Sequence, residues 1–118
     1  MKNNLKFTNM FLLLLGGFSS IAFAATGSIT ILSPKYGAVV KADQPSTVAY
    51  KVNLGTEGNH LHVYVDDQKP IVNRNVTGCP CSVELPGLSA GNHTVVIKEA
   101  RADHSLTGVQ SAIEVTAK

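Results

Sequence analysis

Two histidines alternate with apolar residues at His60-Leu61-His62-Val63, in the middle of the stretch 58–66. Successive side chains on a β-strand leave opposite faces of the sheet, so both imidazoles should share one face while Leu61 and Val63 occupy the other. Imidazole is a common ligand of copper and zinc, and two neighbouring rings supply half of a metal site. The alternative interpretation is a polar strand face that simply meets water.

A third histidine, His104, follows Asp103 in a predicted loop. Strands of an antiparallel sandwich run alternately up and down, so this loop should lie at the same end as the start of the His60 strand. The loop that carries two cysteines should lie there as well. A metal site needs three or four converging donors. The candidate metal ligands are therefore His60, His62 and His104, with Cys79, Cys81 and Asp103 as further candidates.

Only Pro80 separates Cys79 from Cys81. Thiols of an exported protein usually oxidise, so the favoured interpretation is a local disulfide that pins the loop. The alternatives are a bridge to another molecule, or a thiolate pair that binds Cu(I) or zinc. A catalytic redox role is not favoured, because the motif lacks the C-x-x-C spacing at a helix N-terminus that lowers a thiol pKa.

Residues 1–24 have the features of a cleavable signal peptide. Lys2 and Lys6 precede an apolar run, and Ala22-Phe23-Ala24 supplies the small residues that a signal peptidase reads. A membrane anchor is the weaker interpretation, since a spanning helix needs about 20 predominantly apolar residues. We expect a mature chain that begins at Ala25, is periplasmic or secreted, and does not insert into a membrane after cleavage.

The net charge of +2 comes from the predicted signal peptide, because Lys2 and Lys6 are its only charged residues. Residues 25–118 are therefore electrically balanced. Nucleic acids and anionic membranes are recognised through clustered Lys and Arg, so neither is expected as a partner. A segment of this length forms a single domain with one modest core.

From residue 25 onward, apolar residues recur at every second position, and Gly, Pro, Asn or Asp interrupt them at short intervals. This pattern is typical of short strands and predicts no helix of any length. The expected strands are 28–33, 46–54, 59–66, 71–76, 82–85, 93–100 and 109–116, and residues 38–41 can rejoin a sheet edge. The prediction is an all-β, immunoglobulin-like antiparallel β-sandwich of about seven strands.

Residues 31–40 resemble the opening strand of bacterial Ig-like and fibronectin-III-like domains, and residues 88–95 resemble their L-x-x-G-x-Y-T-V segment. Together with the H-x-H-x-Y-V-D strand and the late Asp103-His104, the chain resembles a group of small exported bacterial proteins of uncharacterised function. The resemblance implies the fold and export, and it implies no established activity.

The fourth histidine, His93, has a structural interpretation. It shares an inward strand face with Val95 and Ile97, and strand direction places it at the end opposite His60. Related sandwiches have the tyrosine-corner Tyr at this position, whose polar tip bonds to nearby backbone. We therefore expect a structural His93 rather than a metal ligand.

Residues 58–66 also resemble the G-F-H-x-H-x-F-G-D strand of copper–zinc superoxide dismutases, another Ig-like sandwich. Asn59 and Val65 replace the aromatic residue and the second glycine of that motif. No histidine lies between His62 and His93, so the zinc loop of that family has no counterpart. A dismutase-like enzyme is therefore the remote alternative.

The favoured functional hypothesis is an exported, non-catalytic Ig-like module that binds an unknown protein or small ligand. The alternative is a periplasmic copper or zinc protein that uses His60, His62 and His104, with copper favoured because sulfur donors accompany the imidazoles. No enzymatic activity is expected. Ring nitrogens within roughly 4 Å of a common point would favour the metal site over the plain module.

Overall fold

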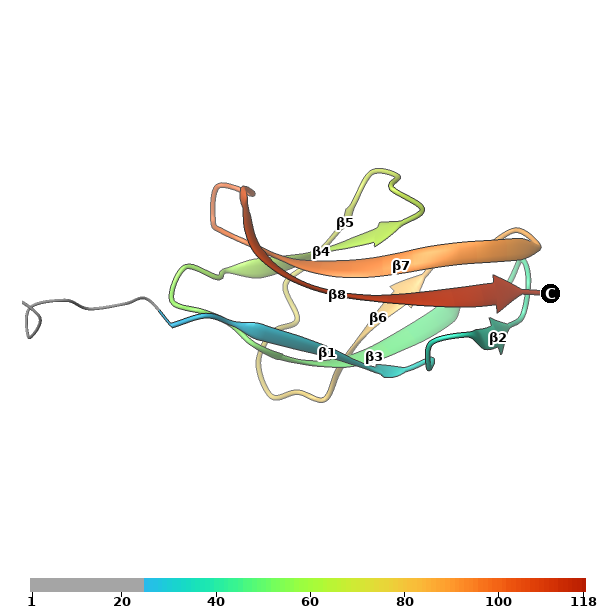
Figure 1. Cartoon of the computed structure of the whole chain (residues 1–118), viewed down its shortest axis with the longest axis horizontal. Helices are drawn as coiled ribbons and strands as arrows, with labels where there is room; N and C mark the ends of the chain where they lie inside the picture. Colours follow the sequence, from blue (N-terminus) through green and yellow to red (C-terminus); the bar gives the residue numbers. More distant parts are fainter. Residues whose placement is uncertain (1–24) are drawn as a thin grey trace, which may run out of the picture.

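The computed structural model describes residues 25–118, and the predicted signal peptide lies outside the described residues. Eight strands form two layers (Figure 1). The three-stranded sheet has the order β1 (Ser28–Ser33), β3 (Ser46–Asn53), β6 (Cys81–Leu85). The five-stranded sheet has the order β2 (Ala38–Val40), β8 (Leu106–Ala117), β7 (Gly91–Ala100), β4 (His60–Val65), β5 (Ile71–Asn73). The predicted all-β sandwich is confirmed.

Within residues 25–118 the structure contains no helix that is long and apolar enough to cross a membrane.

The segment after the first turn rejoins a sheet edge, as expected, and forms strand β2, which pairs in parallel with the end of β8. Strands β3, β4, β6 and β7 differ from the prediction by one or two residues at an end, and β5 and β8 differ by three. Strand β8 begins at Leu106 rather than at residue 109, because Leu106 already pairs with Ala100. Strand β5 ends at Asn73 rather than at residue 76. The Asn73 side chain accepts a hydrogen bond from the backbone N–H of Asn75, a local turn that competes with the strand ladder.

The hydrophobic core lies between the two sheets and follows the predicted alternation. Val48 and Tyr50 of β3 are fully buried, as are Leu61 and Val63 of β4 in the facing sheet. Burying side chains of this size contributes about 1.5–3 kcal/mol each for the aliphatic residues. The side chains of β4 that face the core are thereby fixed in position. Because side chains alternate along a strand, this also fixes the direction of those that face outward.

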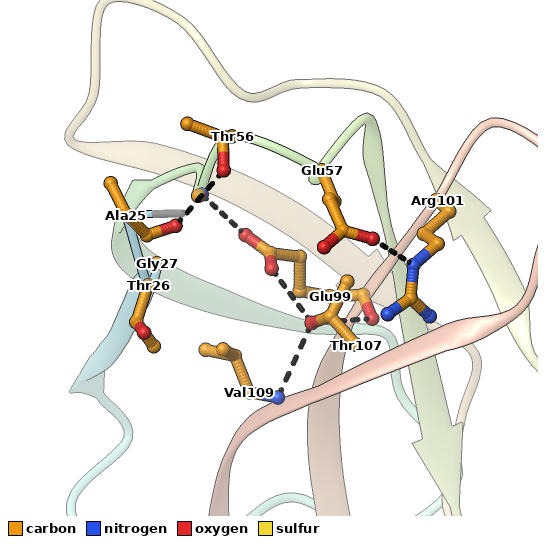
Figure 2. Close-up of a pocket in the computed structure, with 10 residues that line it drawn as sticks. Ala25, Thr26, Gly27, Thr56, Glu57, Glu99, Arg101, Thr107 and Val109 are labelled. Carbon is orange, nitrogen blue, oxygen red and sulfur yellow. Dashed lines mark hydrogen bonds and ion pairs between the residues drawn. The ribbon is translucent and has the colours of Figure 1, made fainter. Parts of the chain in front are cut away.

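A buried carboxylate closes the end of the sandwich near the start of β4 (Figure 2). Glu99 accepts hydrogen bonds from the N–H of Gly55 at 2.9 Å and from the hydroxyl of Thr107 at 2.7 Å. A Cβ on Gly58 would lie 2.5 Å from the Glu99 Oε2 atom, so only glycine permits this close approach. The adjoining cavity is about 110 Å³. Ligand pockets usually enclose about 300–1,000 Å³, so this cavity is small for a ligand.

Tyr50 joins the two sheets through its hydroxyl group. The hydroxyl accepts a hydrogen bond from Asn73 Nδ2 at 2.7 Å and donates one to the Asn75 carbonyl oxygen at 2.5 Å. Tyr50 belongs to the three-stranded sheet, whereas Asn73 ends the edge strand of the five-stranded sheet. These bonds therefore tie β5 to the opposite layer.

Tyr50→Phe should lower the free energy of unfolding by about 1–3 kcal/mol, because the buried Asn73 amide loses its acceptor. Urea unfolding measures the change. Tyr36→Phe is the matched control, since Tyr36 is 69% exposed and bonds Glu114 at the surface. The control should change stability by no more than about 0.5 kcal/mol. Equal effects of the two variants would contradict the role given to Tyr50.

Candidate metal centre

His60 and His62 project from the outer face of β4, as predicted. In the β4–β7 pair His60 lies opposite Ala100 and His62 lies opposite Lys98. On the other side of β4, His62 lies opposite Val72 of β5. Both histidines therefore stand on a strand that has hydrogen-bonded neighbours along both edges, and this support limits the movement of their backbone.

The alternative interpretation, in which the histidine face of the strand meets water, is wrong. His60 is 0% and His62 only 6% exposed. The short loop between β7 and β8 folds across the outer face and brings the ring of His104 onto both histidines. Its centroid lies 4.6 Å from that of His60 and 5.4 Å from that of His62. An exposed residue from a distant part of the sequence thus covers the pair.

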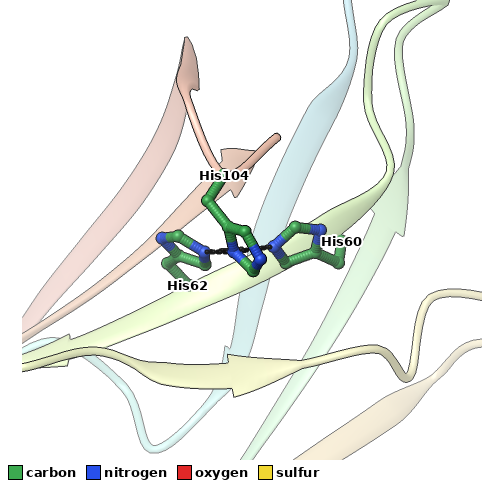
Figure 3. Close-up of side chains that lie close together, drawn as sticks. All are labelled: His60, His62 and His104. Atoms are coloured by element: carbon green, nitrogen blue, oxygen red, sulfur yellow. Dashed lines mark hydrogen bonds between the residues drawn. The ribbon is translucent and has the colours of Figure 1, made fainter. Parts of the chain in front are cut away.

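The three ring systems converge on one point (Figure 3). The Nε2 atoms of His60 and His62 are 3.1 Å apart. The Nδ1 atom of His104 lies 3.1 Å from the first and 3.2 Å from the second. A metal bonded to all three at about 2.0–2.1 Å would lie about 1 Å from their plane, with N–metal–N angles of about 100°. This three-histidine cluster (His60, His62, His104) therefore has the dimensions of a metal site.

Arg74 and Asn59 fix the protonation pattern of His60. Arg74 Nη1 donates to Asn59 Oδ1 at 3.3 Å, and a guanidinium group has only donors, so the atom that it meets is the amide oxygen. The same oxygen accepts a hydrogen bond from His60 Nδ1 at 2.9 Å. Nδ1 therefore carries the hydrogen. The lone pair of the neutral ring lies on Nε2, which faces the centre of the cluster.

His62 has a corresponding partner on its own strand. Its Nδ1 atom lies 3.3 Å from the Tyr64 hydroxyl group, and the two rings meet edge to face. Lys98 of β7 places its ammonium group 4.9 Å from the centroid of the Tyr64 ring. Partners of this kind orient a metal-binding imidazole and leave its other nitrogen toward the metal.

Burial lowers the pKa of both His60 and His62 below the ordinary value for histidine. The positive charge of Arg74, followed by those of His104 and His62, lowers the pKa of His60 further. His104 and then Arg74 act in the same direction on the pKa of His62. Both rings are therefore neutral at neutral pH, and neutral imidazole is the form that binds metals.

The loop that carries His104 is held in place by Arg101. Arg101 Nε donates to Glu57 at 2.7 Å (Figure 2). Its Nη1 donates to the Leu106 carbonyl oxygen at 2.7 Å. The backbone N–H of His104 donates to the Arg101 carbonyl oxygen at 2.9 Å, and His104 has a φ of +73°. Histidine adopts this left-handed conformation more readily than most residues. The turn that presents His104 is therefore held by hydrogen bonds within the protein.

The further candidate ligands do not join the cluster. Cys79 and Cys81 form a disulfide, which confirms the favoured interpretation of the motif and corrects their inclusion as thiolate donors. Cys81 pairs with Tyr50 in the three-stranded sheet, the layer opposite the histidines. Asp103 accepts hydrogen bonds from the N–H and hydroxyl groups of Ser105, and these bonds lower its pKa. Its carboxylate therefore stabilises the turn.

Sequence reasoning did not identify the residues that orient the cluster. Asn59 and Tyr64 belong to the stretch singled out as a strand, so their nearness to a histidine was a usable signal. Arg74 had no such signal, since it lies beyond β5 and reaches Asn59 only through the pairing of β4 with β5.

His93 lies at the opposite end and has a structural role. Its Nε2 donates to the Ser89 carbonyl oxygen at 2.7 Å, four residues upstream, as expected for the tyrosine-corner position. Its Nδ1 lies 2.5 Å from Asp66, a partner that the sequence did not reveal because Asp66 was expected on the polar strand face. Both partners are acceptors, so both ring nitrogens carry hydrogens.

The hydrogen bond to Asp66, followed by the bond to Ser89, raises the pKa of His93. Burial works to raise the pKa of Asp66, but hydrogen bonds from His93 and Thr94 outweigh it and lower that pKa. The His93 contribution to stability is present below pH 6.5 and is lost as pH rises through the raised pKa. The Asp66 contribution is present above pH 3.8 and is lost as pH falls through the lowered pKa.

Comparison with solved structures supports the fold. Fibronectin(III)-like modules of CbhA from Clostridium thermocellum match with a TM-score of 0.59 and 21% identity, over 76% of this chain and 94% of theirs. A superoxide reductase (neelaredoxin) from Ignicoccus hospitalis, in a single-residue variant, matches with a TM-score of 0.50 and 19% identity, over 80% and 82%. The similarity to the CbhA modules identifies a fibronectin-III-like β-sandwich fold. No model of a known family and no curated protein sequence matches the chain.

Asp66→Asn should destabilise the protein most between pH 3.8 and 6.5, where the His93–Asp66 ion pair is fully formed. The difference in unfolding free energy between the two proteins should shrink above and below this window. Urea unfolding at a series of pH values measures it. Taking the difference removes the separate pH dependence of His60 and His62. A difference that does not vary with pH would exclude the ion pair as its cause.

Proposed function

We propose that this protein is an exported, non-catalytic β-sandwich that binds one copper ion through His60, His62 and His104. The observation that carries the proposal is the mutual 3.1–3.2 Å spacing of three ring nitrogens. A proton on any one nitrogen can be shared with the other two. Those two then still face each other as unprotonated acceptors, whereas a metal ion bonds all three lone pairs.

The preference for copper has a different basis from the one first expected. The sulfur donors are absent from the cluster because Cys79 and Cys81 are joined to each other. A nitrogen-only site still binds Cu²⁺ more tightly than Zn²⁺ by the general order of divalent affinities. Zinc suits the same donors, so it is the competitor against which copper must be measured.

The non-catalytic role is supported by what surrounds the cluster. Among residues 25–118 no carboxylate joins it: Asp103 is bonded to Ser105, and Glu99 lies on the inward face of β7. General acid–base chemistry needs a titratable group within hydrogen-bond reach of the substrate. Copper storage, delivery or tolerance in the periplasm or outside the cell requires no such group. The likeness to a superoxide reductase concerns the fold, and superoxide turnover by copper-loaded protein would overturn the non-catalytic role.

Protein spanning residues 25–118, prepared without a histidine tag, should bind about one copper per chain, as a single three-ligand site requires. His60→Ala combined with His62→Ala should abolish this binding, since one imidazole remains. Equilibrium dialysis followed by elemental analysis measures the ratio, with equimolar zinc as competitor. His93→Gln is the matched control, because it removes a histidine at the other end of the sandwich. Full copper occupancy in the double variant would refute the proposed site.

Cys79→Ser combined with Cys81→Ser, and separately Asp103→Asn, should leave copper stoichiometry unchanged, because neither set contributes a donor to the cluster. The same dialysis measurement applies, with far-ultraviolet circular dichroism to confirm that each variant is folded. Loss of copper from a folded cysteine variant would show that sulfur is a ligand after all.

A further inference from the structure

The groups that meet the second ring nitrogens of His60 and His62, on the side away from the centre of the cluster, carry no negative charge. Metal-binding histidines commonly donate their second N–H to a carboxylate, a backbone carbonyl or water. Here His60 donates to the side-chain amide of Asn59, and His62 meets the phenol of Tyr64. Neither partner offsets the charge of a bound cation.

Two cations contact these partners. The Arg74 guanidinium contacts the same Asn59 oxygen that accepts from His60. The Lys98 ammonium lies 4.9 Å above the Tyr64 ring. Asp103 is the acidic residue nearest in sequence to a ligand, and its carboxylate is bonded to Ser105. The two charged groups that contact Asn59 and Tyr64 are therefore both positive, and each disfavours a divalent ion twice as strongly as a monovalent one.

The triangle of nitrogens supplies ligands on one side of a metal only. Two nitrogens on opposite sides of a tetragonal Cu²⁺ ion lie about 4 Å apart. The three separations in the cluster are 3.1, 3.1 and 3.2 Å, so no pair lies across the metal. A Cu²⁺ ion would therefore need water or another ligand opposite the imidazoles, whereas three nitrogen ligands satisfy Cu(I), which has a filled d shell.

We propose that the cluster selects Cu(I) over Cu(II), and that Arg74 is a specificity-determining residue for this choice. The inference rests on the proposed copper function and names the oxidation state that the site holds. Arg74 acts through its charge, at the far side of Asn59, without touching the metal.

The test compares two dissociation constants of tag-free protein spanning residues 25–118. Cu(I) affinity is measured against a colorimetric Cu(I) chelator with ascorbate under nitrogen, and Cu(II) affinity against a Cu(II) chelator in air. Cu(I) should bind at least about tenfold more tightly. Arg74→Gln keeps an amide donor for Asn59 but removes the charge, and it should narrow the ratio of the two affinities by about threefold, as expected for a unit charge in a partly solvated setting.

Two further variants separate charge from position. Arg74→Lys retains the charge and should retain the ratio. Lys51→Gln removes an exposed cation from the three-stranded sheet and should leave the ratio unchanged. Tighter binding of Cu(II), or the same ratio in Arg74→Gln as in the unaltered protein, would overturn the inference while leaving a copper site intact. If neither copper ion binds, or if His60→Ala leaves copper binding unchanged, the proposed function itself is refuted.

Discussion

The closeness of three ring nitrogens is the constraint around which the outer face of this protein is organised. His60 Nδ1 is committed as a donor to Asn59, so its Nε2 must face the other two nitrogens as a lone pair. Separations of 3.1–3.2 Å allow one bound cation to satisfy all three groups together. Burial adds to this constraint, because water does not reach His60 to solvate its lone pair.

The sandwich supplies the rigidity that this arrangement needs. Leu61 and Val63 are fixed in the core, and they alternate with the two histidines along the same strand. The third histidine comes from a loop, and loops ordinarily move more than strands. Arg101 limits that motion by bonding to Glu57 and to the Leu106 carbonyl oxygen. Two of the histidines therefore stand on an internal strand, and the third stands on a turn held by hydrogen bonds within the protein.

The strands, the layer architecture and the two faces of β4 could be predicted from residue alternation, because side-chain direction follows directly from strand geometry. Strand direction also placed His104 near His60 and His93 far from it. The burial of the histidines could not be predicted in this way, since it depends on how one short loop folds over a distant strand. The same holds for Arg74, whose contact with Asn59 exists only after β5 has paired with β4.

X-ray absorption spectroscopy of copper-loaded protein decides whether the three histidines hold the metal, because it reports the atoms bonded to the ion. Three imidazole nitrogens are expected at about 2.0 Å, with no sulfur near about 2.3 Å. A sulfur shell, or a fit with fewer than three imidazoles, would contradict the proposed site.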